Sequence, residues 1–192
     1  MDMPENKGGK HDDSYFAADR RKRKKYMTII IPVIVAVVAA GVIGAIFYKP
    51  APALAVSGVE CHGTESTTYH VHSHLDLFVD GQRQEIPAQI GILSSPYCLF
   101  WLHTHSADGV IHVESPTKRE FTLGQFLDIW SQTHKESKPL LDAVANKTAT
   151  AYVNGTHVQD YRSIPLESRK QIVLAYGTPP SEIPTYDFGG LT

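Results

Sequence analysis

Sulfur is scarce in this chain of 192 residues, which has three methionines and two cysteines. The methionines are Met1, Met3 and Met27, so the chain beyond residue 27 contains none. Their absence there excludes a thioether-ligated Cu(I) site and a blue-copper site with an axial methionine. Neither Cys61 nor Cys98 belongs to a Cys-x-x-Cys pair. The sulfur inventory thus leaves nitrogen and oxygen as the main ligand atoms.

Charge is missing from residues 28–47, which are almost wholly Ile, Val, Ala and Gly. A helix rises about 1.5 Å per residue, so this run spans the roughly 30 Å hydrocarbon core of a membrane. The unbroken basic block 20–25 predicts a cytoplasmic N-terminus and an exported C-terminal part. A cleaved signal peptide is the alternative, because Ala53-Leu54-Ala55 fits a cleavage site, but the apolar run exceeds the usual length of about 7 to 15 residues.

The predicted organisation is therefore that of a single-pass cell-membrane protein. We expect a cytoplasmic charged tail (1–25), a transmembrane helix (26–48), a tether (49–66) and an extracytoplasmic domain (67–192). Both cysteines lie on the exported side, where an oxidising compartment favours a disulfide between Cys61 and Cys98. A cysteine metal ligand and a free thiol are the alternatives.

Several motifs of catalysis and binding are also missing. The sequence has no nucleophile elbow, phosphate-binding loop, dinucleotide fingerprint or His-x-x-x-His zinc-protease helix. Residues 49–192 contain more acidic than basic side chains, which gives no support to nucleic acid as a partner. No catalytic residue can be named on these grounds, and a binding role is favoured over an enzymatic one.

Histidine, in contrast, is abundant, and six of the ten histidines fall in two short windows. These six are His70, His72, His74, His103, His105 and His112. Alternate residues of a strand share a face, so the first three line one face of a predicted strand over 67–79. The second window predicts a hairpin across 106–109, in which either His105 or His103 stands opposite His112, depending on the turn length. Asp76 and Glu114 extend the two histidine faces and could orient an imidazole.

Such a group of imidazoles predicts a transition-metal site, because neutral imidazole is the commonest protein ligand for these ions. Imidazoles gathered on one patch repel one another as they protonate unless a cation or carboxylate accompanies them. Copper ranks first by the Irving–Williams order, zinc is the close alternative, and non-haem iron fits less well. A pH-sensing cluster and a chance gathering of surface histidines are the competing interpretations.

The element pattern predicts an α+β domain with a mostly antiparallel sheet of hairpins and one main helix. Thr122 and Gln125 fit a capping box that opens a helix of about ten residues. Phe126 and Trp130 recur on its apolar face and are expected in the core. The order of helix and strands after Phe121 resembles the C-terminal half of ubiquitin-like β-grasp domains.

Several sequence motifs together resemble a family of exported or membrane-anchored prokaryotic His-rich domains, bacterial or archaeal. They are His-x-His-x-His at 70–74, Ile-Pro-Ala-Gln-Ile-Gly at 86–91, Leu-His-Thr-His at 102–105, Ile-His-Val-Glu-Ser-Pro at 111–116 and Phe-Thr-Leu-Gly-Gln-Phe at 121–126. The resemblance covers most of residues 60–190 and implies a location in a prokaryotic envelope, but it supplies no activity.

These observations predict a membrane-anchored protein that binds copper, or alternatively zinc, for capture or delivery outside the cytoplasm. Its partners would be the membrane and a metal-acceptor protein or a membrane complex. An envelope metalloenzyme and a structural accessory subunit of a membrane complex are the two alternatives. An exposed site would favour delivery, a deep pocket an enzyme, and a large apolar patch an accessory subunit.

Overall fold

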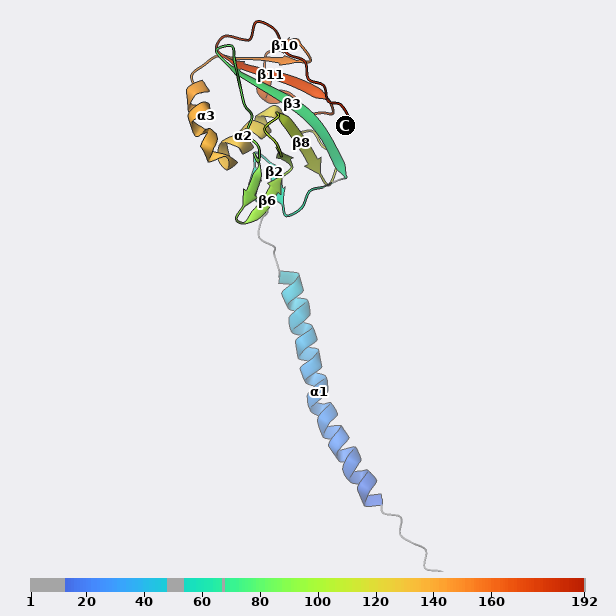
Figure 1. Ribbon diagram of the computed structural model, residues 1–192. Coiled ribbons are helices and arrows are strands. Elements are labelled where there is room, and N and C mark those ends of the chain that lie inside the picture. Colours follow the sequence, from blue (N-terminus) through green and yellow to red (C-terminus); the bar gives the residue numbers. More distant parts are fainter. Residues whose placement is uncertain (1–12, 48–53, 67, 192) are drawn as a thin grey trace, which may run out of the picture. The chain divides into compact units, whose positions relative to one another are not determined.

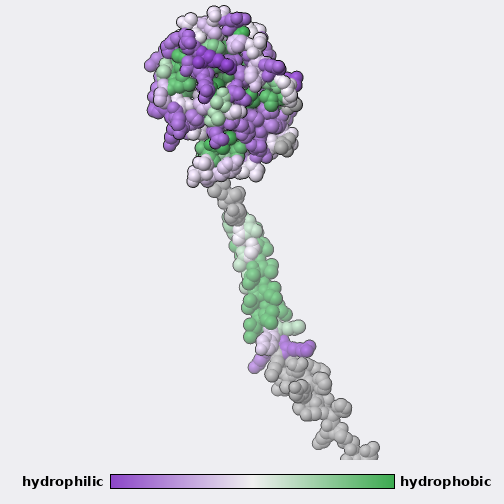
Figure 2. Space-filling view, in the orientation of Figure 1, coloured by the Kyte–Doolittle hydropathy of each residue, from purple (hydrophilic) through white to green (hydrophobic). Residues whose placement is uncertain are grey.

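The computed structural model describes residues 13–47, 54–66 and 68–191, and the chain divides into two compact units between Ala51 and Pro52. The described part of the first unit is the helix α1 (Asp13–Phe47). Within the described residues, one stretch, Arg23–Phe47, is long and apolar enough to cross a membrane, a test that a signal sequence also meets. Its apolar side chains are exposed along the helix (Figure 2). The helix includes residues 13–25 of the predicted tail, whereas residues 1–12 lie outside the described part.

The second unit is an α+β domain, as the sequence predicted (Figure 1). Its strands are β1 (Ala55–Val56), β2 (Val59–His62), β3 (Tyr69–Val79), β4 (Gln82–Gln84), β5 (Ile92–Ser94), β6 (Tyr97–Phe100), β7 (Leu102–His103), β8 (Val110–Ser115), β9 (Ala149–Val153), β10 (Thr156–Val158) and β11 (Lys170–Tyr176). Its helices are α2 (Leu123–Thr133) and α3 (Lys138–Val144), with short 3-10 turns at Lys135–Ser137 and Tyr161–Ser163.

The larger sheet has the order β10-β9-β11-β3-β8-β7, with β4 paired to the end of β3. Its central strands, β3 and β11, are parallel, and the other pairs are antiparallel. Helix α2 lies in the chain between β8 and β9. The order β8-β3-β11-β9-β10 with a parallel central pair is the β-grasp arrangement. The likeness expected for the C-terminal half therefore extends to β3 and β8.

The smaller, four-stranded sheet has the order β1-β2-β6-β5 and was not predicted. Its first two strands correct the predicted tether 49–66, because Val56 and Val59 are buried in the core. A disulfide between Cys61 on β2 and Cys98 on β6 confirms the predicted pairing and joins the two central strands of this sheet. Residues 49–53 of the predicted tether, and residue 48 of the predicted transmembrane helix, lie outside the described part.

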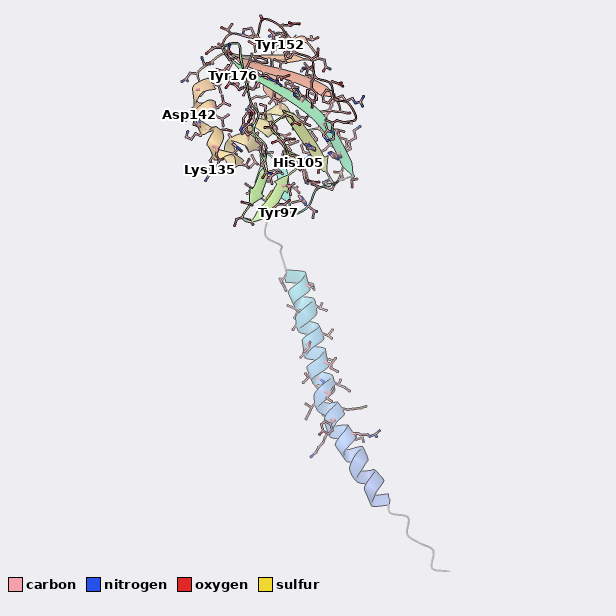
Figure 3. The ribbon with its side chains drawn as sticks, viewed as in Figure 1. Tyr97, His105, Lys135, Asp142, Tyr152 and Tyr176 are labelled. Atoms are coloured by element: carbon pink, nitrogen blue, oxygen red, sulfur yellow. A yellow bond between two sulfur atoms is a disulfide. The ribbon has the colours of Figure 1, made fainter. Side chains whose placement is uncertain are left out.

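The segment that precedes the predicted hairpin turn is divided at Trp101 into β6 and β7, where the chain passes from the smaller sheet to the larger one. Strand β6 belongs to the first sheet and β7 to the second. The two sheets occupy different regions of the domain, and Tyr97 of β6 lies far from Tyr152 of β9 (Figure 3). This crossing brings the second histidine window beside the first.

The core lies between α2 and the sheets. Thr122 accepts from the backbone of Gln125, and the Gln125 side chain accepts from the backbone of Thr122, which confirms the predicted capping box. Phe126 and Trp130 are buried as expected. The Trp130 indole donates to Ser137 over 2.8 Å, so its polar edge is satisfied inside the core.

Candidate metal centre

Three neighbouring strands place one histidine each at the same level of the larger sheet. His72 of β3 pairs with His112 of β8, and His112 pairs with His103 of β7. Side chains directly opposite one another share a face of the sheet, so the three rings project together. This register decides between the two predicted turns in favour of the longer loop, with His103 opposite His112. His105 lies two residues beyond the end of β7, and its ring lies 4.5 Å from that of His112, measured between centroids.

His103 forms the floor of this group, with only 1% of its side chain exposed. Its Nδ1 lies 2.8 Å from the carbonyl oxygen of Phe100. A carbonyl can only accept, so Nδ1 carries the hydrogen and the lone pair lies on Nε2. Metal-binding histidines usually donate their second ring N–H in this way, which fixes the ring. Burial lowers the pKa of His103 to about 4, so the imidazole is neutral and able to ligate at neutral pH.

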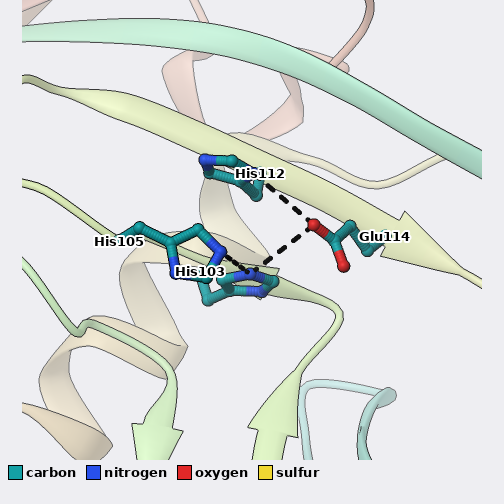
Figure 4. A group of neighbouring side chains, drawn as sticks. All are labelled: His103, His105, His112 and Glu114. Atoms are coloured by element: carbon teal, nitrogen blue, oxygen red, sulfur yellow. Dashed lines mark hydrogen bonds and ion pairs between the residues drawn. The ribbon is translucent and has the colours of Figure 1, made fainter. Parts of the chain in front are cut away.

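Glu114 of β8 supplies a buried carboxylate to the same group (Figure 4). Its Oε1 lies 3.1 Å from His70 Nε2, 3.5 Å from His112 Nδ1 and 3.8 Å from His103 Nε2. Burial opposes ionisation, but the hydrogen bond with His112 and the nearby His103 and His70 rings hold the pKa of Glu114 below its usual value. Within the described part of the chain, the buried Oε2 has no hydrogen-bond partner. A buried carboxylate oxygen without a hydrogen-bond partner is what we expect of a site that binds a cation.

Among the described residues, two sets of side chains could hold a metal ion, each with its ligand atoms within 4.8 Å of one another. We call the group formed by both sets the His/Glu cluster, and its members are His70, His72, His103, His105, His112 and Glu114. Four tetrahedral ligands at 2.0–2.1 Å from zinc lie about 3.3 Å apart. The 3.2 Å between His103 Nε2 and His105 Nε2 is close to that separation. The cluster is thus compatible with a metal ion before any large rearrangement.

His74 does not join the cluster, although it lies on the same face of β3. The residue opposite it on β8 is Val110, so no imidazole faces it across the sheet. Its ring stacks on Tyr186 at 3.6 Å between centroids, and Nε2 lies 2.9 Å from the carbonyl oxygen of Asp108. Burial is the main cause that lowers the pKa of His74. The prediction of His74 as a ligand is therefore not supported by its position.

The two predicted orienting carboxylates have different surroundings. Asp76 forms an ion pair with Arg83, accepts from Gln171 and lies 3.4 Å from His74 Nδ1, all away from the cluster. Glu114 lies inside the cluster, and its carboxylate is one of the groups that could hold an ion. Sequence reasoning missed Glu65, whose carboxylate lies 3.3 Å from His105 Nε2. Glu65 falls in the stretch interpreted as a tether and carries no local signal of its role.

The cluster has a buried floor and an exposed rim. His72, His103 and Glu114 are buried, whereas the side chains of His70 and His105 are 36% and 40% exposed. A cavity of about 570 Å³ is lined by His74, Asp76, Arg83 and Tyr186, and another of about 640 Å³ lies beside Tyr69 and Arg119. Neither of these two cavities includes a member of the cluster. An ion in the cluster would therefore be reached from the surface at the rim.

Gly109 closes the turn between the two strands that carry His103 and His112. It has φ +81, and a Cβ there would lie 2.5 Å from the carbonyl oxygen of Leu75 and 3.0 Å from His74 Nε2. Gly155 has nearly the same φ, +80, with nothing within 4 Å of a Cβ. We predict that Gly109→Ala destabilises the domain by about 1–3 kcal/mol more than Gly155→Ala does. Melting followed by tryptophan fluorescence checks this, and equal losses in the two variants would contradict it.

Comparison with known proteins gives no match for this chain. Neither the protein-family models, nor the curated proteins, nor the solved structures contain one that matches it. We therefore infer the function from the His/Glu cluster itself.

Proposed function

We propose that this domain binds one of the late first-row transition metals, copper or zinc, for capture or delivery outside the cytoplasm. The observation that carries the proposal is the environment of Glu114. Its buried carboxylate has three imidazole nitrogens within 3.8 Å of Oε1, while Oε2 has no hydrogen-bond partner within the described residues. Several imidazoles around one ionised carboxylate make a donor set that suits a divalent ion.

Copper is the preferred occupant and zinc the alternative. The cluster offers imidazole nitrogen and carboxylate oxygen, the donor types that suit Cu(II) and Zn(II), and copper binds such sites more tightly by the Irving–Williams order. The cysteines form the disulfide and so leave no thiolate to favour zinc. When bound, the ion would satisfy Glu114 and screen the imidazoles from one another.

Delivery is favoured over catalysis because the rim of the cluster is exposed. His70 and His105 can enter or leave the coordination of an ion without unfolding the floor, which supports exchange with a partner. The basic residues before the apolar stretch Arg23–Phe47 support an outward-facing domain by the positive-inside rule. The acceptor would be a protein able to offer competing ligands near the membrane surface. The resemblance to exported prokaryotic His-rich domains is consistent with this location.

Metal content tests the proposal. The full chain, purified in detergent without a His-tag, is expected to hold or take up stoichiometric copper or zinc by elemental mass spectrometry. The double variant His103→Ala/His112→Ala should lose that metal, because it removes two ligands of the four-residue set and the one residue shared with the second set. His157→Ala, an exposed histidine of β10 outside the cluster, serves as the matched control and should keep it. A native chain that takes up neither metal at micromolar concentration would overturn the proposal.

A further inference from the structure

His112 lies at the centre of the His/Glu cluster and belongs to both candidate ligand sets. One set is His103, His105, His112 and Glu114, and the other is His70, His72 and His112. The His112 ring centroid lies 4.5 Å from those of His72 and His105. It lies 5.4 Å from that of His103 and 5.6 Å from that of His70. The two sets are therefore neighbours that meet at a single side chain.

One nitrogen of the His112 ring, Nδ1, lies close to a member of each ligand set. Its Nδ1 lies 3.3 Å from His70 Nε2 and 3.5 Å from Glu114 Oε1. A ring nitrogen has one lone pair, so Nδ1 can hold one ion at a time. Glu114 is also the only carboxylate in the two sets, and a single negative charge compensates little of the repulsion between two neighbouring dications. Simultaneous occupation of both sets is disfavoured on both grounds.

We infer that the cluster holds one ion in two overlapping positions. This inference rests on the metal binding proposed above. In the holding position the ligands are His103, His105, His112 and Glu114. In the transfer position they are His70, His72 and His112. The ion passes between the two by exchange of ligands while His112 stays bound, so no free ion is released and no electron is transferred.

The two positions differ in ways that suit these roles. The holding position contains the buried carboxylate and the ring fixed by the Phe100 carbonyl, so it binds a divalent ion more tightly. The transfer position has three imidazoles and no carboxylate, and one of the imidazoles, His70, is exposed and can be replaced by a ligand of an acceptor. His70 Nε2 also lies 3.1 Å from Glu114 Oε1, so it is near enough to take over an ion from the carboxylate.

Zinc is the probe for this inference, because Zn²⁺ has one oxidation state and redox chemistry does not interfere. The experiment compares the native full chain in detergent with His70→Ala and Glu114→Gln. We expect one zinc ion per chain in all three, with weaker binding in Glu114→Gln, which then uses the transfer position. His70→Ala should pass zinc to a competing chromophoric chelator about tenfold more slowly than the native chain. His157→Ala, which lies outside the cluster, should keep the native affinity and transfer rate.

Each other outcome has a definite meaning. Two zinc ions in the native chain and one in each variant would show two independent sites and overturn the inference. Loss of all binding in Glu114→Gln, or an unchanged transfer rate in His70→Ala, would overturn it as well. A native chain that binds no zinc and no copper would instead defeat the proposed function itself. Tryptophan fluorescence melting confirms that both variants are folded, since Trp101 and Trp130 are buried in the domain.

Discussion

Replacement of His112 by alanine is expected to weaken copper or zinc binding at least about a hundredfold. His112 is the one side chain shared by both ligand sets, so the variant leaves neither set complete. Loss of a group that merely orients a ligand already costs about 10- to 100-fold in affinity, and loss of a shared ligand should cost no less. The measurement is a competition titration against a chelator of known affinity.

The fold should tolerate this change. His112 lies in the middle of β8, whose backbone pairs with β3 and β7 remain available to alanine. His157→Ala removes a histidine from the exposed edge strand β10 and is the matched control, with native affinity expected. Binding by His112→Ala within a few-fold of the native chain would contradict a central role for His112.

Acidification is expected to destabilise the metal-free domain by about 3 kcal/mol between neutral pH and about pH 4. Burial lowers the pKa of His103 from 6.5 to about 4 in the folded chain. Between these two values the unfolded chain binds a proton that the folded chain does not, so unfolding becomes more favourable as the pH falls. The contribution is present above pH 6.5 and is lost progressively toward pH 4. The lowered pKa of Glu114 adds a loss in the same direction at lower pH.

Denaturant unfolding of the chelator-treated chain, followed by tryptophan fluorescence, measures this dependence. His103→Gln removes the titrating ring and should flatten the curve between neutral and mildly acidic pH. His74 keeps part of the slope in that variant, because its pKa is also lowered by burial. His157→Gln should retain the native pH dependence. A native domain equally stable at both ends of this range would contradict the burial of a neutral His103.

Local signals predicted the parts of the fold that depend on neighbouring residues. The capping box at Thr122 and Gln125 marks the start of α2. The sequence also contains Asp80-Gly81 and Asn154-Gly155, two dipeptides that favour hairpin turns, and all four residues have positive φ. The smaller sheet gave no such signal. Its strand β1 has two residues and β5 has three, which is too short for an alternating pattern. The chain divides at Trp101 into β6 and β7 because the two halves join different sheets, and no local pattern indicates this division.

For the candidate metal site, as for the fold, the sequence predicted the features that depend on neighbouring residues and missed those that depend on distant strands. Alternation along β3 correctly placed His70 and His72 on one face, because side-chain direction in a strand is a local property. Exclusion of His74 depends on Val110 standing opposite it, and this register is set by a strand more than thirty residues further along the chain. The burial of Glu114 also follows from tertiary packing. No short window of sequence contains that information.

The parallel pairing of β3 with β11 also determines when this domain can fold. Strand β3 carries the first histidines and lies near the start of the domain, whereas β11 is its last strand. Until β11 is available, one edge of β3 has unpaired backbone groups, and an edge of this kind recruits other chains into aggregates. Pairing between distant segments is also slow to form. A chain translated only as far as residue 169 would therefore remain vulnerable, and folding is completed only after nearly the whole domain has been synthesised.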